Sequence, residues 1–197
     1  MSASAPAAPV DVVVKVGGGL LADIETFDGV LAVVAAAARS CHLVVVPGGG
    51  SFADAIRAVD RRIGLPDTAA HWMAVLAMDQ HAHLITSRLT GAALVAEPRE
   101  IAAAIDAGHI PVLAPSRWLR DADPLPHSWD VTSDSIAAWV AGRLCARRLV
   151  LVKPPGVGAT AEVVDPYFTR AVPPGTEALI IAADQIDALR SALLTAS

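Results

Sequence analysis

The stretch "VVVKVGGGLL" at residues 12–21 decides how the rest of the chain is interpreted. Its β-branched apolar residues predict a buried strand over 11–16, in which Lys15 stands almost directly before three glycines. A second stretch, "LVVVPGGGSFADAIR" at residues 43–57, repeats the order of apolar strand, glycine triplet and helix. Two such units in the first third of the chain indicate loops that share one ligand.

Strand and helix patterns alternate along the whole chain. Strands are predicted over 11–16, 42–46, 92–96, 109–115, 147–153 and 177–182, and helices over 27–40, 51–62, 65–89, 98–108, 132–145 and 184–195. Near-continuous apolar strands separated by helices are typical of a parallel sheet with helices on both faces. The predicted fold class is therefore α/β, a three-layer αβα sandwich around an open, mainly parallel sheet.

Length and composition limit the kinds of protein that this chain can be. With 197 residues, 54% of them hydrophobic and 18% charged, it has enough apolar side chains for one sizeable core. We expect residues 11–197 to form a single domain, because no linker interrupts them. Residues 1–10 are expected to form a disordered tail, since they lack the basic and apolar segments of a signal peptide.

Charge, hydropathy and cysteine usage exclude several partners. The net charge of −5 is unfavourable for binding nucleic acid, which needs clustered cations. No apolar run reaches the roughly 18 residues of a membrane span. The two cysteines, Cys41 and Cys145, are too few for a disulfide framework and are typical of reduced thiols. We therefore expect a cytoplasmic protein that binds neither nucleic acid nor membrane.

Both glycine triplets are placed where a parallel sheet binds ligands, beyond the carboxyl ends of its strands. Glycine lets the main chain approach a ligand closely, so that its N–H groups donate to phosphate oxygens. Lys15 precedes its glycines, whereas a Walker loop has its lysine after them, and the dinucleotide fingerprint is also absent. A lysine at a strand end beside such amides suits phosphoryl transfer, which needs positive charge on the transferred oxygens.

A third segment, "SWDVTSDSIAAWVAGRL" at residues 128–144, carries Asp134 in the first turn of a predicted helix. One interpretation is an acid favoured by the helix dipole, with Asp130 as N-cap and with Thr132 and Ser133 capping the helix or binding substrate. The other is that Asp134 orients Lys15 and Lys153. Without such a counter-charge, two lysines in one pocket would repel each other and lose protons.

Four segments together resemble the amino acid kinase superfamily, which includes acetylglutamate, aspartate and uridylate kinases. They are "VKVGGGLL", "VVVPGGGSFADAIR", "DVTSDSIAAWVA" and "LVLVKPPGV", and the resemblance covers about residues 11–158. It implies an ATP-dependent kinase, with Mg²⁺ carried on the phosphates of ATP. It also implies roles for catalysis (Lys15, Asp134, Lys153), nucleotide binding (Gly17, Gly18, Gly19, Lys153, Gly156) and binding of a small anionic acceptor (Gly48, Gly49, Gly50, Ser51, Thr132, Ser133).

Within this superfamily, "PGGGSFAD", "AHWMAVLAMDQ" and "SWDVTSDSIAAW" are most similar to the short branch that contains the aminomethyl-furanmethyl phosphate kinase of methanofuran biosynthesis. That branch converts a phosphomonoester to a diphosphate. The similarity to a kinase of methanofuran biosynthesis implies a role in one-carbon metabolism. Arg57, after the second glycine loop, would contact such an anionic acceptor or belong to a solvated basic face.

The chain departs from the superfamily after the predicted strand 147–153. Other members usually continue with an acidic "VDGVY"-like segment, whereas this chain has "KPPGVGA" at 153–159. Only about forty residues follow Lys153, which predicts a shortened nucleotide-side lobe. Two other functions therefore remain open: a non-catalytic nucleotide- or oxoanion-binding protein, as molybdenum storage proteins are, and a carboxylate or carbamate kinase of another branch.

The predicted helix over 65–89 carries further candidates. It is apolar around much of its circumference, which indicates a homodimer or higher homo-oligomer formed through it. No metal site is expected on it, because Asp79 and His83 share a face but His71 lies two turns back and His81 points elsewhere. Three tryptophans elsewhere either line an acceptor pocket or belong to the core (Trp118, Trp129, Trp139).

Overall fold

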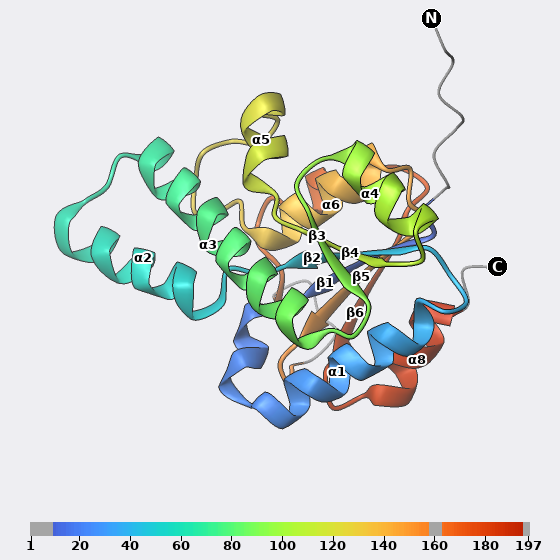
Figure 1. Cartoon of the computed structure of the whole chain (residues 1–197). Coiled ribbons are helices and arrows are strands. Elements are labelled where there is room, and N and C mark those ends of the chain that lie inside the picture. Colours follow the sequence, from blue (N-terminus) through green and yellow to red (C-terminus); the bar gives the residue numbers. More distant parts are fainter. Residues whose placement is uncertain (1–9, 158–162, 195–197) are drawn as a thin grey trace, which may run out of the picture.

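The computed structural model describes residues 10–157 and 163–194 and contains one six-stranded sheet (Figure 1). The strands lie in the order β3-β4-β2-β1-β5-β6, and every paired strand is parallel to its neighbour. Their bounds are β1 Val12–Val16, β2 Leu43–Pro47, β3 Ala92–Val95, β4 Ile110–Leu113, β5 Arg148–Lys153 and β6 Glu177–Ala182. The predicted α/β class and parallel sheet are confirmed.

Helices cover both faces of this sheet, as the three-layer prediction requires. Figure 1 shows α1 and α8 together on one side and α4 and α6 on the other, while α2 and α3 extend beyond the sheet. The helices are η1 Gly18–Ala22, α1 Ile24–Ala37, α2 Gly50–Ile63, α3 Asp67–Arg88, α4 Pro98–Asp106, α5 Ser116–Ala122, α6 Ser133–Arg143, α7 Phe168–Ala171 and α8 Ile186–Leu194.

Two cores form because side chains alternate between the faces of each strand. Val12, Val14 and Val16 pack with α1 and α8, whereas Val13 packs with α4, α5 and α6. Leu149 and Leu151 of β5 lie on the same side as Val13. These strands are buried on both faces, which explains why their sequences are apolar without alternation.

Several predicted boundaries are wrong for local reasons. Helix α1 begins at Ile24 rather than at residue 27, because the Asp23 side chain accepts hydrogen bonds from the N–H groups of Glu25 and Thr26. Helix α3 begins at Asp67 rather than at residue 65, with Pro66 at its N-cap position. The short helices η1, α5 and α7 were not predicted at all.

The predicted disordered tail, residues 1–10, lies outside the described residues except for Val10, whose side chain is buried. Residues 158–162 of the predicted shortened lobe also lie outside them. Among the helices in the described residues, none is long and apolar enough to cross a bilayer.

Candidate active site

Both lysines of the predicted site project from the face of the sheet that α6 covers. Side chains two residues apart on a strand point to the same face, so Lys15 lies on the face of Val13, and Lys153 lies on the face of Leu151. These two apolar residues belong to the core beneath α6. Strands β1 and β5 are neighbours, with Lys15 opposite Leu151. Lys153 therefore occupies the next position on that face, at the carboxyl ends of the strands.

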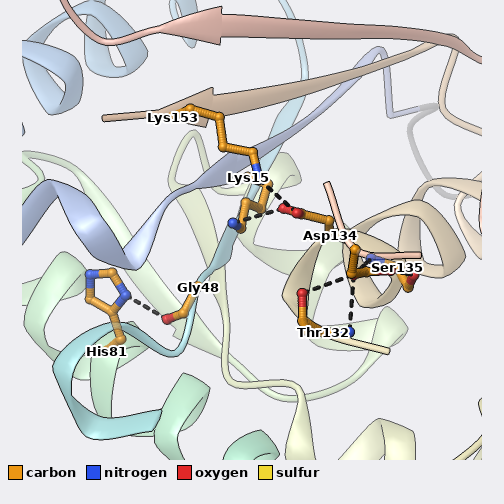
Figure 2. Close-up of polar contacts among 8 residues, drawn as sticks. Lys15, Gly48, His81, Thr132, Asp134, Ser135 and Lys153 are labelled. Atoms are coloured by element: carbon orange, nitrogen blue, oxygen red, sulfur yellow. Dashed lines mark hydrogen bonds and ion pairs between the residues drawn. The ribbon is translucent and has the colours of Figure 1, made fainter. Parts of the chain in front are cut away.

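Asp134 lies between the two ammonium groups (Figure 2). Its Oδ1 is 2.9 Å from Lys15 Nζ, and its Oδ2 accepts a hydrogen bond of 2.6 Å from Lys153 Nζ. All three residues are buried, and the relative exposure of Asp134 is 4%. The structure thus brings together the three residues that the sequence proposed as catalytic, and it does so through direct ion pairs.

Burial and charge set the protonation of this group. Burial alone would raise the pKa of Asp134, but the charges of Lys15 and Lys153 lower it below the usual carboxyl value. The pKa of Lys153 is lowered by burial and then by the charge of Lys15, while Asp134 and Asp165 act in the opposite direction. Asp134 is consequently an ionised counter-charge near neutral pH rather than a proton donor.

These two residues are also the only lysines in the 197-residue sequence, in which every other cationic side chain apart from histidine is arginine. An ammonium group is a compact point charge, unlike the planar guanidinium group. Lysine thus occurs in this chain only where Asp134 binds it. The same fact limits a lysine-specific spectrum to the signals of these two side chains.

The two glycine loops touch each other beside this group. A Cβ atom built on Gly18 would lie 2.1 Å from Gly50 N, and one built on Gly48 would lie 2.6 Å from Gly18 N. Gly17 N–H donates to Val152 O and Gly48 N–H donates to Val16 O, so these two amides are already engaged at the ends of the strands. The glycines that line a cavity are Gly18, Gly19, Gly49 and Gly50.

His81 of α3 forms a hydrogen bond with the second glycine loop. Its Nδ1 lies 2.6 Å from Gly48 O, as Figure 2 shows, and a carbonyl oxygen can only accept, so Nδ1 carries the proton. Burial lowers the pKa of His81, and the charge of Lys15 lowers it further, which keeps the ring neutral. His81 was considered in the sequence only as a metal ligand, and the structure gives it this contact instead.

A cavity of about 290 Å³ opens from the glycines toward α2, α3 and the loop before α6. Its lining includes the predicted acceptor residues Arg57, Thr132 and Ser133, with Trp129. Thr132 Oγ1 donates to Asp165 Oδ2 at 2.8 Å, so its proton is not available to a ligand. Arg57 lies over the ring of Trp129, 4.9 Å from the centroid, and pairs with Asp54.

Other predicted site residues lie outside this lining, including Lys15, Asp134, Lys153, Gly17 and Gly48. Ser51 is exposed on α2, and Gly156 is exposed in the turn after β5 with a φ of 74°. Of the three tryptophans, Trp129 lines the cavity, whereas Trp118 and Trp139 contact each other, with ring centroids 4.8 Å apart, within the core beneath α6. The core interpretation is therefore correct for Trp118 and Trp139.

The histidine and acidic side chains of α3 that were examined as metal ligands have different surroundings. His71 lines the cavity, and burial lowers its pKa to about 4, with a further contribution from His127. Asp79 Oδ1 accepts from Ser116 N. Within residues 10–157 and 163–194, no group of three or more potential metal-ligating side chains is found.

One buried acid of the site was missed in the sequence. Asp165, 9% exposed, accepts hydrogen bonds from Thr132 and Ser135 at the start of α6. The signal in "VVDPY" is only an aspartate before proline, which usually marks a turn. Nothing in the local sequence connects Asp165 with a helix that begins about thirty residues earlier.

The contact between the glycine loops leads to a stability prediction. We expect Gly18→Ala to lower the free energy of unfolding by about 2–4 kcal/mol, because its Cβ would overlap main-chain atoms of Gly50. Thermal unfolding measures the change. Gly29→Ala in α1 is the matched control: no heavy atom lies within 4 Å of that Cβ, so it should stabilise the helix by about 0.5–1 kcal/mol. A Gly18→Ala protein as stable as the wild type would contradict the contact.

Comparison with known proteins places this geometry in a family. A relative from Methanocaldococcus jannaschii, [5-(aminomethyl)furan-3-yl]methyl phosphate kinase, is 27% identical over 139 residues, which cover 71% of this chain and 63% of that protein. The chain therefore spans less than two thirds of this relative's length.

Two solved structures share the fold. The uridylate kinase of Archaeoglobus fulgidus superposes with a TM-score of 0.72 at 16% identity, covering 94% of this chain and 96% of that one. The UMP kinase of Ureaplasma parvum superposes with a TM-score of 0.68 at 13% identity, covering 96% and 97%. The model of the amino acid kinase family matches residues 12–154, and the chain belongs to this family.

Proposed function

We propose that this protein is an ATP-dependent phosphotransferase whose acceptor is a small phosphomonoester. The observation that carries the proposal is the buried group of Lys15, Asp134 and Lys153 beside two touching glycine loops. Two ammonium groups and main-chain amides can hold the transferred phosphoryl group and stabilise its developing charge. ATP would bring Mg²⁺ on its phosphate oxygens, which are ligands that this ion prefers.

A phosphate acceptor agrees with the role of Asp134. A phosphomonoester is close to a dianion at neutral pH, so its oxygen needs no general base. That oxygen forms a bond to the γ-phosphorus while the bond to the β–γ bridging oxygen breaks, which releases ADP and a diphosphate product. Burial would raise the pKa of Asp134, but the charges of the two lysines lower it. The carboxylate therefore orients these cations throughout the reaction without accepting a proton.

The cavity suits a small ring whose phosphate lies beside the glycines. Glycines form part of its lining, and apolar side chains form another part, among them Val75, Met78 and Ile136. Asp67 also lines the cavity, and no ion pair is found for it among the described residues. A carboxylate there would attract an amine on the ring. These features, with the activity for which the Methanocaldococcus relative is named, support aminomethyl-furanmethyl phosphate as the acceptor.

Acceptor profiling tests this proposal. The protein with ATP and Mg²⁺ is offered aminomethyl-furanmethyl phosphate, the analogue without the amine, UMP, glutamate and carbamate, and ADP release and ³¹P spectra are recorded. We expect a diphosphate product with the first compound. Asp67→Asn should raise its KM about tenfold and leave the KM of the analogue without the amine unchanged.

Two outcomes would replace the proposal. Turnover with a carboxylate or carbamate would indicate a kinase of another branch. ATP binding without turnover of any acceptor would favour a non-catalytic nucleotide- or oxoanion-binding protein. The segment "KPPGV", in place of the usual acidic continuation, is the feature that favours this second reading.

A further inference from the structure

The start of α6 lacks the side-chain cap that a helix normally has. The first N–H groups of a helix have no partner within it, and Thr132, at the N-cap position, makes no capping hydrogen bond with its side chain. Asp165 supplies the acceptors from a distant segment. Its Oδ2 accepts from Thr132 N and Ser135 N, each at 3.0 Å, and from Thr132 Oγ1 at 2.8 Å. Its Oδ1 accepts from Ser135 Oγ.

Water cannot easily replace these hydrogen bonds. Asp165 is 9% exposed, Ser135 is fully buried and Asp134 is 4% exposed. The segment that carries Asp165 is itself fixed, because Phe168 N–H donates to Asp165 O and Tyr167 N–H donates to Asp130 O. The Phe168 side chain is buried in the core beneath α6. Asp165 is thus a rigid support for the first turn of α6.

Asp134 lies within the turn that Asp165 holds. Asp165 holds Thr132 and Ser135, which precede and follow Asp134 in the sequence. Figure 2 shows both of them near Asp134. Thr132 and Ser133 also line the cavity. We propose that Asp165 is a positioning residue, which through its hydrogen bonds fixes both the counter-charge of the two lysines and one wall of the acceptor cavity. This inference rests on the proposed phosphotransferase function.

Asparagine and alanine separate the hydrogen bonds of Asp165 from its charge. In Asp165→Asn the amide oxygen still accepts hydrogen bonds at the position of Oδ2, and the amide NH₂ can donate to Ser135 Oγ, whose own hydrogen rotates away. Asp165→Ala removes every one of these contacts. Misplacement of reacting groups by about 1 Å costs about 10²-fold in rate.

The experiment measures kcat, the acceptor KM and the two lysine side-chain NMR signals in each variant. We expect Asp165→Ala to lower kcat about 30- to 100-fold, to raise the acceptor KM several-fold and to shift both lysine signals, while Asp165→Asn restores kcat to within about fivefold of the wild type. Arg148→Ala is the stability control. It removes contacts with Glu177 and Ala192 O at the opposite end of β5, so it should lower Tm without changing kcat.

Three outcomes would overturn the inference. In the first, Asp165→Ala keeps kcat within about threefold of the wild type. In the second, Asp165→Asn loses as much kcat as Asp165→Ala, which would assign the effect to charge rather than to positioning. If the wild type shows no acceptor-dependent turnover, the proposed function fails by itself. The lysine signals then decide on Asp165, and unchanged signals in Asp165→Ala would refute its role.

Discussion

Replacing Asp134 with asparagine is expected to lower kcat about 10³-fold, the largest effect of any single substitution in this site. The reason is that Asp134 contacts both ammonium groups, at 2.9 Å and 2.6 Å, so its charge holds both of them in place. Asparagine has nearly the same shape but no charge. The two buried lysines would repel each other, and at least one would lose its proton or turn away from the phosphates.

The same variant should be less stable in a pH-dependent way. Removing one partner of a buried ion pair costs about 3–5 kcal/mol, because the other charge remains buried. In the variant the folded chain releases a lysine proton at a lower pH than the unfolded chain. Its free energy of unfolding therefore rises with pH through that interval, and its deficit relative to the wild type shrinks as the pH rises toward the ordinary pKa of lysine.

Denaturant unfolding at several pH values measures this deficit. Asp28→Asn is the matched control, since Asp28 pairs with Arg88 on the surface, where the carboxylate is 45% exposed. Loss of such a solvent-exposed pair changes stability little. If Asp134→Asn were as active and as stable as Asp28→Asn, the central role of Asp134 would be wrong.

The sequence was sufficient for the sheet and for the centre of the site. Continuous apolar strands and the glycine triplets at their ends predicted a parallel sheet with a ligand site at its carboxyl edge, and the structure has this sheet. Lys15 and Lys153 could be brought together because each lies near the carboxyl end of a strand. Asp134 could be added because two nearby cations require a counter-charge.

The remaining parts of the site depend on contacts between distant segments. Asp165 caps a helix from about thirty residues further along the chain, and His81 of α3 contacts Gly48 of the second loop. Neither pairing leaves a local pattern, because a capping residue or a histidine on a helix has the same sequence signal wherever its partner lies. Trp129 lies in a loop and Trp118 lies in α5, a helix that was not predicted. The sequence therefore did not distinguish the tryptophan of the cavity from that of the core.

Lys15→Met is expected to lower acceptor-dependent kcat by about 10²-fold or more while the protein stays folded. The remaining pair explains the difference from Asp134→Asn: Lys153 still donates to Asp134 at 2.6 Å, so no buried charge is left alone. Arg99→Met is the control for the loss of one positive charge, since Arg99 is exposed on α4. Its kcat should equal that of the wild type.

Lysine NMR gives this variant a second readout that does not need turnover. The wild type should show two lysine side-chain signals, and Lys15→Met should remove one of them. Burial lowers the pKa of Lys153 most, and the charge of Lys15 lowers it further. Without that charge, the remaining signal should titrate at a higher pH than in the wild type. A Lys153 titration that does not move would mean that the two ammonium groups do not share Asp134, and the site would lose the arrangement on which the proposed phosphoryl transfer depends.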